Sequence, residues 1–177
     1  MADDALSLLF VCTHNSARSV AAECVARKWA EERGRRVRCY SAGTRGSGEI
    51  KEAVGRALER AGYSLEGLRG KSLEALISSG EVEGHITHVI AMCCEGASDI
   101  QEPRMRDLLS KLGEEVKHIS YEVAAPTTLC RQEGLCGDEL EANVHYDRFC
   151  ALPFHYVWQR ESRSPSSHRH PPRNRNR

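Results

Sequence analysis

Short hydrophobic runs alternate with helical patterns along the chain. Residues 6–11 form an almost continuous apolar run, which is typical of a strand buried on both faces. A polar stretch leads to Ser19, and apolar residues then recur at offsets of three and four up to Gly34, which predicts an amphipathic helix. Val37–Tyr40 predicts a second strand.

The alternation continues beyond the second strand. We expect a second amphipathic helix over residues 50–61, ended by Gly62, and a shorter helix around residues 73–77. We further predict a third strand at residues 87–92 and a helix opened by proline at 103–112. A fourth strand is predicted at 116–121 and a final helix at about 138–152. Strands that alternate with helices indicate an α/β fold of three layers, with a parallel open sheet of about four strands covered by helices on both faces.

Charge divides the chain into two parts. The 177 residues carry 25 Lys and Arg against 25 Asp and Glu, but residues 159–177 hold six arginines and one glutamate, so residues 1–158 have a net charge of −5. We therefore predict one domain at 1–158 and a basic tail at 159–177. The tail is rich in Ser, Pro, His and Asn, and we expect it to be disordered. Its alternative role is a basic arm for nucleic acid or anionic lipid.

The start of the chain and the cysteines bear on location and metal binding. The N-terminus is acidic where a secretory signal would be basic, and the first apolar run is far shorter than the roughly 20 residues of a membrane span, so we expect a cytoplasmic protein without membrane insertion. None of the eight cysteines has zinc-site spacing, and we predict no metal. Cys24, Cys39 and Cys150 lie in apolar patterns and are expected in the core.

The turn after the first strand carries the candidate chemistry. Ligands of open α/β sheets bind beyond the carboxyl ends of strands. Here Cys12 and Arg18 are separated by five residues between a strand and a helix, which suits a phosphate-sized oxyanion. The intervening residues would turn backbone N–H groups toward the anion, and Arg18 would clamp two of its oxygens. These intervening residues are Thr13, His14, Asn15, Ser16 and Ala17. The positive surroundings would also favour the thiolate of Cys12, the candidate nucleophile.

With Cys12, Asn15, Arg18 and Ser19 in place, the sequence resembles the low-molecular-weight protein tyrosine phosphatases and the arsenate reductases of the same fold, whose shared loop is Cys-x-x-Asn-x-x-Arg-Ser. The resemblance extends over roughly residues 5–155 and includes Ser41-Ala42-Gly43-Thr44. It implies that Cys12 forms a cysteinyl-phosphate, that Arg18 binds the transferring group and that Ser19 hydrogen-bonds the sulfur. Asn15 would hold the strained loop, and the His14 ring would line the rim or add positive charge.

The general acid of the phosphatase branch has no counterpart in the sequence. That branch takes the acid from an Asp-Pro pair, whereas this chain has Ala125-Pro126 at the corresponding place and no Asp-Pro anywhere. Glu122 and Asp138 are the candidate substitutes. A chain without the acid could instead be a phosphate-binding pseudophosphatase.

The reductase branch needs thiols after the third strand. Cys93 and Cys94 stand there and are candidate redox residues, although adjacent cysteines form a poor disulfide. Cys93 could equally end a buried strand. Cys130 and Cys136 would reach the site only if their loop folds over it.

These observations predict a cysteine-dependent phosphomonoesterase, a protein-tyrosine phosphatase acting through a Cys12 cysteinyl-phosphate. The alternatives are a thiol-coupled arsenate reductase and a pseudophosphatase. No cofactor is implied. The expected partners are a phosphorylated protein or a small phosphate or arsenate oxyanion, with thioredoxin or a small thiol for the reductase.

Overall fold

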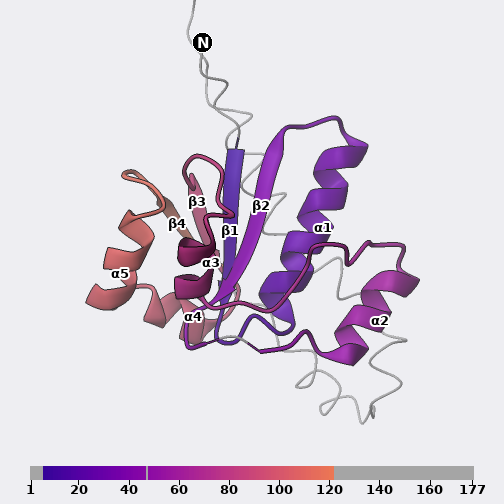
Figure 1. Cartoon of the computed structure of the whole chain (residues 1–177), viewed down its shortest axis with the longest axis horizontal. Coiled ribbons are helices and arrows are strands. Elements are labelled where there is room, and N and C mark those ends of the chain that lie inside the picture. Colours follow the sequence, from indigo (N-terminus) through magenta and orange to yellow (C-terminus); the bar gives the residue numbers. More distant parts are fainter. Residues whose placement is uncertain (1–5, 47, 122–177) are drawn as a thin grey trace, which may run out of the picture.

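A parallel sheet forms the centre of the computed structural model, which describes residues 6–46 and 48–121. Its four strands lie in the order β2-β1-β3-β4 (Figure 1). The strands are β1 Leu6–Cys12, β2 Val37–Gly43, β3 His88–Ala91 and β4 Lys117–Ser120. In register, Cys12 at the end of β1 pairs with Gly43 at the end of β2. Both β1 and β3 therefore have a neighbouring strand on each side, and residues 7–12 of β1 and all of β3 are buried.

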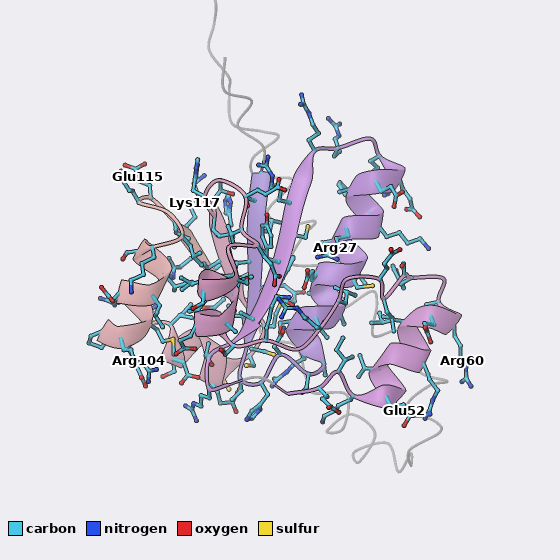
Figure 2. All side chains as sticks on the ribbon, in the orientation of Figure 1. Arg27, Glu52, Arg60, Arg104, Glu115 and Lys117 are labelled. Atoms are coloured by element: carbon cyan, nitrogen blue, oxygen red, sulfur yellow. The ribbon has the colours of Figure 1, made fainter. Side chains whose placement is uncertain are left out.

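Helices cover both faces of this sheet. They are α1 Arg18–Glu32, α2 Glu52–Arg60, α3 Leu73–Ser79, α4 Cys94–Asp99 and α5 Pro103–Ser110. The helices α1 and α2 lie together on one side of the strands, while α3, α4 and α5 lie on the other (Figure 1). Their charged side chains, such as Arg60 and Arg104, extend away from the sheet into solvent (Figure 2). The expected three-layer α/β fold is confirmed over these residues.

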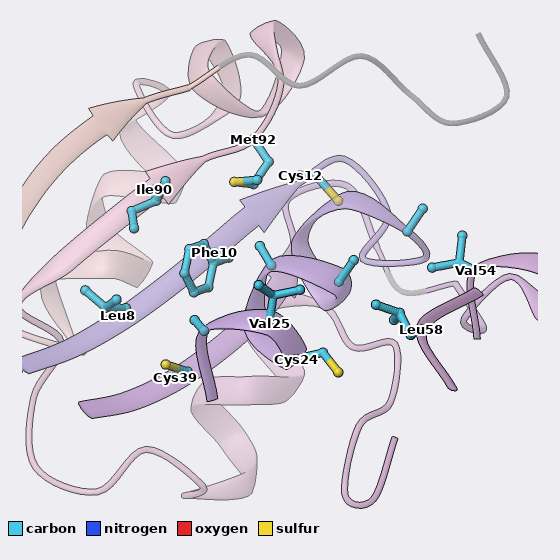
Figure 3. Close-up of a cluster of buried hydrophobic side chains, with 14 of the residues drawn as sticks. Leu8, Phe10, Cys12, Cys24, Val25, Cys39, Val54, Leu58, Ile90 and Met92 are labelled. Atoms are coloured by element: carbon cyan, nitrogen blue, oxygen red, sulfur yellow. The ribbon is translucent and has the colours of Figure 1, made fainter. Parts of the chain in front are cut away.

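Alternation along β1 divides the core in two. Leu8 and Phe10 point toward α1, whereas Leu9 and Val11 point toward α3 and α5, as expected for a strand whose successive side chains face opposite sides. Figure 3 shows the first cluster, whose buried residues include Phe10, Val25, Cys24 and Cys39. Cys24 and Cys39 are thus core residues, as predicted, and Cys150 lies outside the described residues.

Most predicted elements are present, with shifts of a few residues at their ends. The first helix begins at Arg18, one residue before the end of the predicted polar stretch, and β2 continues through Gly43 because its last residues remain paired to β1. No sequence pattern predicted α4, because its six residues are too few for a recognisable apolar period. The predicted helix at 138–152 lies outside the described residues.

Parallel strands bring their carboxyl ends to one edge of the sheet, where the loops after β1, β2 and β3 meet. The loop after β1 is residues 12–19, here called the Cys12 loop. Within the described part of the chain, no helix has the length and apolar character needed to cross a membrane.

Candidate active site

The Cys12 loop is held from outside by the segment that follows β2. Four backbone N–H groups of residues 44–51 donate hydrogen bonds to carbonyl groups of the loop. The pairs are Thr44 to Cys12, Arg45 to Thr13, Gly48 to His14 and Lys51 to Ser16, at 2.9, 3.0, 2.8 and 2.9 Å. Figure 3 shows Cys12 at the tip of β1, where the chain curls toward α1. The loop is therefore a fixed turn.

The outward carbonyls orient the loop's N–H groups. In a trans peptide the C=O and the next N–H point in opposite directions, so a carbonyl bound from outside leaves the following N–H directed inward. At the end of the loop, α1 begins after Ala17, which has no side chain to cap the first N–H groups. This combination of inward N–H groups and an uncapped helix N-terminus favours an anion.

Asn15 has the strained backbone that the loop needs. Its φ is +54°, and it is the one non-glycine residue with positive φ among the described residues. Asparagine tolerates this left-handed region better than most residues. Its side chain is fully buried, so both its conformation and its amide are set by neighbours.

The Asn15 amide fixes the direction of the hydrogen bonds that reach the sulfur. The Lys71 N–H donates to Asn15 Oδ1 at 2.9 Å, so Nδ2 faces two hydroxyls and donates to Ser19 Oγ and Ser41 Oγ, both at 2.8 Å. Ser19 Oγ lies 2.9 Å from Cys12 Sγ. Because Ser19 accepts from Asn15, its own hydrogen is available to donate to the sulfur.

A buried ion pair lies behind this network. Ser41 Oγ donates to Glu23 Oε2 at 2.5 Å, and the Lys71 ammonium lies 3.9 Å from the same oxygen. Glu23 is fully buried and Lys71 is 3% exposed. Burial raises the pKa of the Glu23 carboxyl, although Lys71, Arg27 and Ser41 oppose the rise, and burial lowers the pKa of Lys71 although Glu23 opposes that fall. Arg27 also pairs with Glu23 from one turn along α1.

The opposite side of the loop is held by α4. Asp99, which is 3% exposed, accepts a hydrogen bond from Thr44 Oγ1 at 2.5 Å and binds the Arg45 guanidinium through both oxygens, the closest contact being 2.7 Å. Burial alone would raise the pKa of Asp99, but the hydrogen bonds from Arg45 and Thr44 bring it below its usual value. Thr44 and Arg45 are the residues whose N–H groups bind the loop at Cys12 and Thr13.

Only one of the two candidate redox thiols lies against the loop. Cys93 is buried, its Sγ accepts a hydrogen bond from the Gly96 N–H at 3.3 Å, and it lies 3.7 Å from Thr13 Oγ1. A Cβ added at Gly96 would lie 3.3 Å from Cys93 Sγ and 3.4 Å from Cys12 Cα, so this glycine lies close to both cysteines. Cys94 is exposed.

Arg18 and Glu95 bring opposite charges to the same edge. Arg18, the first residue of α1, is half-buried. The exposed Glu95 carboxyl accepts hydrogen bonds from the backbone N–H of Glu95 itself and from the Cys94 side chain, and these bonds lower its pKa. The charge of Arg18 lowers this pKa further. Glu95 is therefore a carboxylate at neutral pH, which suits it poorly to donate a proton.

The other predicted residues fall into three groups. Thr13 and Ala17 are buried within the loop, and Ser16 is half-buried. His14 is exposed, as a residue at the rim would be. The third group lies outside the described residues. It contains the candidate acids Glu122 and Asp138, the Ala125-Pro126 pair, and the thiols Cys130 and Cys136. Within residues 6–46 and 48–121 no cluster of potential ligands could hold a metal ion.

The sequence patterns did not reveal Glu23, Lys71 or Asp99 as part of the site. Each stands far along the chain from its partner, and a charged residue in a helical pattern normally marks the solvent face. One signal was present for Glu23, which stands between Ala22 and Cys24 in a stretch of small and apolar residues.

Burial makes two other thiols of the described residues, those of Cys24 and Cys39, unreactive. It raises the pKa of Cys24 to about 11 and that of Cys39 to about 12. Such thiols stay protonated and unreactive at neutral pH.

Comparison with known proteins identifies the family. The sequence profile of the low molecular weight phosphotyrosine protein phosphatases matches residues 7–142. The fold is similar to that of YfkJ from Bacillus subtilis, with a TM-score of 0.60 and 19% identity over 91% of this chain and 99% of that chain. The fold is also similar to that of the tyrosine phosphatase Wzb from Escherichia coli K30, in complex with sulphate. The TM-score is 0.56 and the identity 20%, over 85% of this chain and 97% of that chain.

A thioredoxin-dependent arsenate reductase from Corynebacterium glutamicum is also similar, with a TM-score of 0.56 and 19% identity over 90% of this chain and 65% of that chain. No curated protein sequence matches the chain. The family profile spans well over half of the 177 residues and includes the whole Cys12 loop. The chain belongs to the low molecular weight phosphotyrosine protein phosphatase family.

Proposed function

We propose that the protein is a cysteine-dependent phosphomonoesterase that acts on phosphotyrosine in proteins. The contact that carries this proposal is the 2.9 Å approach of Ser19 Oγ to Cys12 Sγ, in a loop whose carbonyls are bound from outside. A hydroxyl that donates to sulfur stabilises a thiolate, and inward N–H groups stabilise the oxyanion next to it. The sulphate in the Wzb structure supports an oxyanion ligand for this fold.

The proposed reaction uses these positions. The Cys12 thiolate attacks phosphorus, so that an S–P bond forms while the P–O bond to tyrosine breaks, and Arg18 and the loop N–H groups bind the equatorial oxygens. The phenolate takes a proton from a general acid, for which Glu122 and Asp138 remain the candidates. Water then attacks phosphorus, releases phosphate and restores the thiolate, while Ser19 stabilises the departing sulfur.

Hydrolysis of an aryl phosphate tests the proposal. We expect turnover by the wild-type protein, a loss of several orders of magnitude in Cys12→Ser and a loss of at least about 100-fold in Arg18→Ala. Arg33→Ala is the matched control, because Arg33 follows α1 at its far end. Phosphopeptide binding without turnover would instead identify a pseudophosphatase. If the absent acid limits the rate, Ala125→Asp should increase turnover about tenfold or more.

The position of Cys93 favours arsenate reduction as a second activity. In that reaction the Cys12 thiolate displaces water from arsenate, and the Cys93 thiolate then attacks Cys12 sulfur. The disulfide forms, arsenic(V) leaves as arsenite with the two electrons, and thioredoxin or a small thiol reduces the disulfide. Arsenate turnover that is lost in Cys93→Ser and retained in Cys94→Ser would support this activity, and retention in both variants would contradict it.

We also propose that the enzyme works in the cytoplasm. A reactive Cys12 requires a reducing compartment. All five cysteines of the described residues are free thiols, which agrees with such a compartment.

A further inference from the structure

We infer that Glu23 and Lys71 are positioning residues, which together fix the Asn15 amide and thereby direct the Ser19 hydroxyl at Cys12. The inference deepens the proposed function and rests on it. In this inference their effect on Cys12 passes through the hydrogen bonds that join Ser41, Asn15 and Ser19.

The two residues secure both ends of one amide. The backbone N–H of Lys71 donates to Asn15 Oδ1 at 2.9 Å. At the other end Asn15 Nδ2 donates to Ser41, and Ser41 donates to Glu23 Oε2. The Lys71 ammonium lies 3.9 Å from that oxygen, so the contacts form a ring of four residues: Asn15, Ser41, Glu23 and Lys71. The four residues come from the Cys12 loop, β2, α1 and the segment before α3, so the ring joins four separate parts of the chain.

Counting hydrogens shows what the ring determines. Ser41 has one hydroxyl hydrogen and gives it to Glu23, so its oxygen can only accept from Asn15. The second Nδ2 hydrogen goes to Ser19. Ser19 consequently has its own hydrogen left for Cys12 Sγ.

The opposite orientation of the amide would remove that hydrogen from the sulfur. If Asn15 were flipped, Oδ1 would face the two hydroxyls and both would donate to it. The Lys71 N–H opposes the flip at one end of the amide, and the Glu23 carboxylate opposes it at the other by taking the Ser41 hydrogen.

Stability alone explains this pair poorly. Moving two charges out of water is costly, and replacing a buried ion pair with apolar residues often leaves a protein equally stable or more stable. Glu23 is 0% exposed and Lys71 is 3% exposed, so both bear that cost. Arg27 on α1 (Figure 2) and Arg69 in the segment before α3 also act electrostatically on Glu23, and Glu23 acts in turn on the thiols of Cys24 and Cys39.

The test uses a double variant that keeps the fold but removes the acceptor. Glu23→Leu/Lys71→Met replaces both charges, and Arg27 can turn its half-exposed side chain to solvent. Alkylation of Cys12 by iodoacetamide is followed by mass spectrometry as a function of pH, and aryl phosphate hydrolysis is measured in parallel. Glu31→Leu, on the exposed part of the same helix, is the control.

We expect the midpoint of the Cys12 alkylation profile to rise by about one pH unit in the double variant and kcat to fall about tenfold, with KM nearly unchanged. Glu23→Gln/Lys71→Met should restore most of both values, because a glutamine carbonyl can still accept from Ser41. An unchanged midpoint in the folded double variant would refute the inference. A lowered midpoint would refute it too, since it would show that Glu23 acts only as a negative charge.

Ser41→Ala decides the matter if the double variant does not fold. This change leaves both charges in place and breaks only the link to Asn15, so the same rise is expected, and its absence overturns the inference. Alkylation does not require turnover. A wild-type protein that fails to hydrolyse any aryl phosphate would therefore contradict the proposed function, while the alkylation midpoints would still test the positioning role.

Discussion

Asn15 combines two demands in one residue. A backbone φ of +54° costs most L-residues roughly 1–2 kcal/mol, and asparagine reduces this cost. Its amide makes three hydrogen bonds, to Ser19, Ser41 and Lys71. Glycine would satisfy the backbone without the amide, and alanine would satisfy neither.

This difference gives a prediction with two variants. The free energy of unfolding of Asn15→Gly should exceed that of Asn15→Ala by about 1 kcal/mol, because only glycine adopts the positive φ without strain. Both variants should lose aryl phosphate turnover about equally, on the order of 100-fold, because both lack the amide. Urea unfolding and steady-state kinetics measure the two effects. Equal unfolding free energies would mean that the loop relaxes to a different backbone in alanine.

At the scale of elements, the sheet edge depends on how β2 and α4 hold the Cys12 loop between them. Residues 44–51 bind the loop carbonyls, and Asp99 on α4 binds the side chains of Thr44 and Arg45. An arginine that is more than half exposed contributes less than a buried one, so the Asp99 contacts stabilise this segment only modestly.

Asp99→Asn should reveal this contribution through its pH dependence. The pKa of Asp99 is lowered in the folded state, so its contribution is complete above the ordinary aspartate pKa of about 3.9 and is lost as pH falls through the lowered value. We expect the variant to be less stable than wild type at pH 7, with a difference that shrinks below about pH 4. Urea unfolding across this range measures it.

Asp107→Asn on the exposed face of α5 is the control for that experiment. Asp107 forms a surface ion pair with Lys111 at 3.6 Å, which should contribute less than about 0.5 kcal/mol. A difference that stays constant with pH for Asp99→Asn would show that the carboxylate charge is not what holds the segment.

The elements show where sequence reasoning succeeds and where it stops. Strands such as β1 were predictable because burial on both faces requires a continuous apolar run, and Cys12, Asn15, Arg18 and Ser19 were predictable because one loop contains them all. The partners of that loop were not. Asp99 meets Thr44 across 55 residues, and only the strand order β2-β1-β3 brings their segments together.

At the scale of the whole molecule, an anion bound by the Cys12 loop should stabilise the entire fold. Ligand that binds only the native state adds about 2.7 kcal/mol at 100 times its dissociation constant. We expect inorganic phosphate to raise Tm in a concentration-dependent way, relative to chloride at equal ionic strength. Arg18→Ala should abolish the rise, whereas Arg33→Ala should retain it. The same rise in Arg18→Ala would place the anion elsewhere.

The four hydrogen bonds that fix the Cys12 loop come from main-chain N–H groups, so no side chain of residues 44–51 takes part in these bonds. Proline has no N–H and would remove a bond at Thr44, Arg45, Gly48 or Lys51, and any side chain at Gly46 would be strained by its φ of +127°. An exposed side chain beside the Cys12 loop, such as that of Lys51, can consequently change while the main-chain bonds to the loop remain. Such freedom agrees with the similarity of this fold to those of both a tyrosine phosphatase and an arsenate reductase.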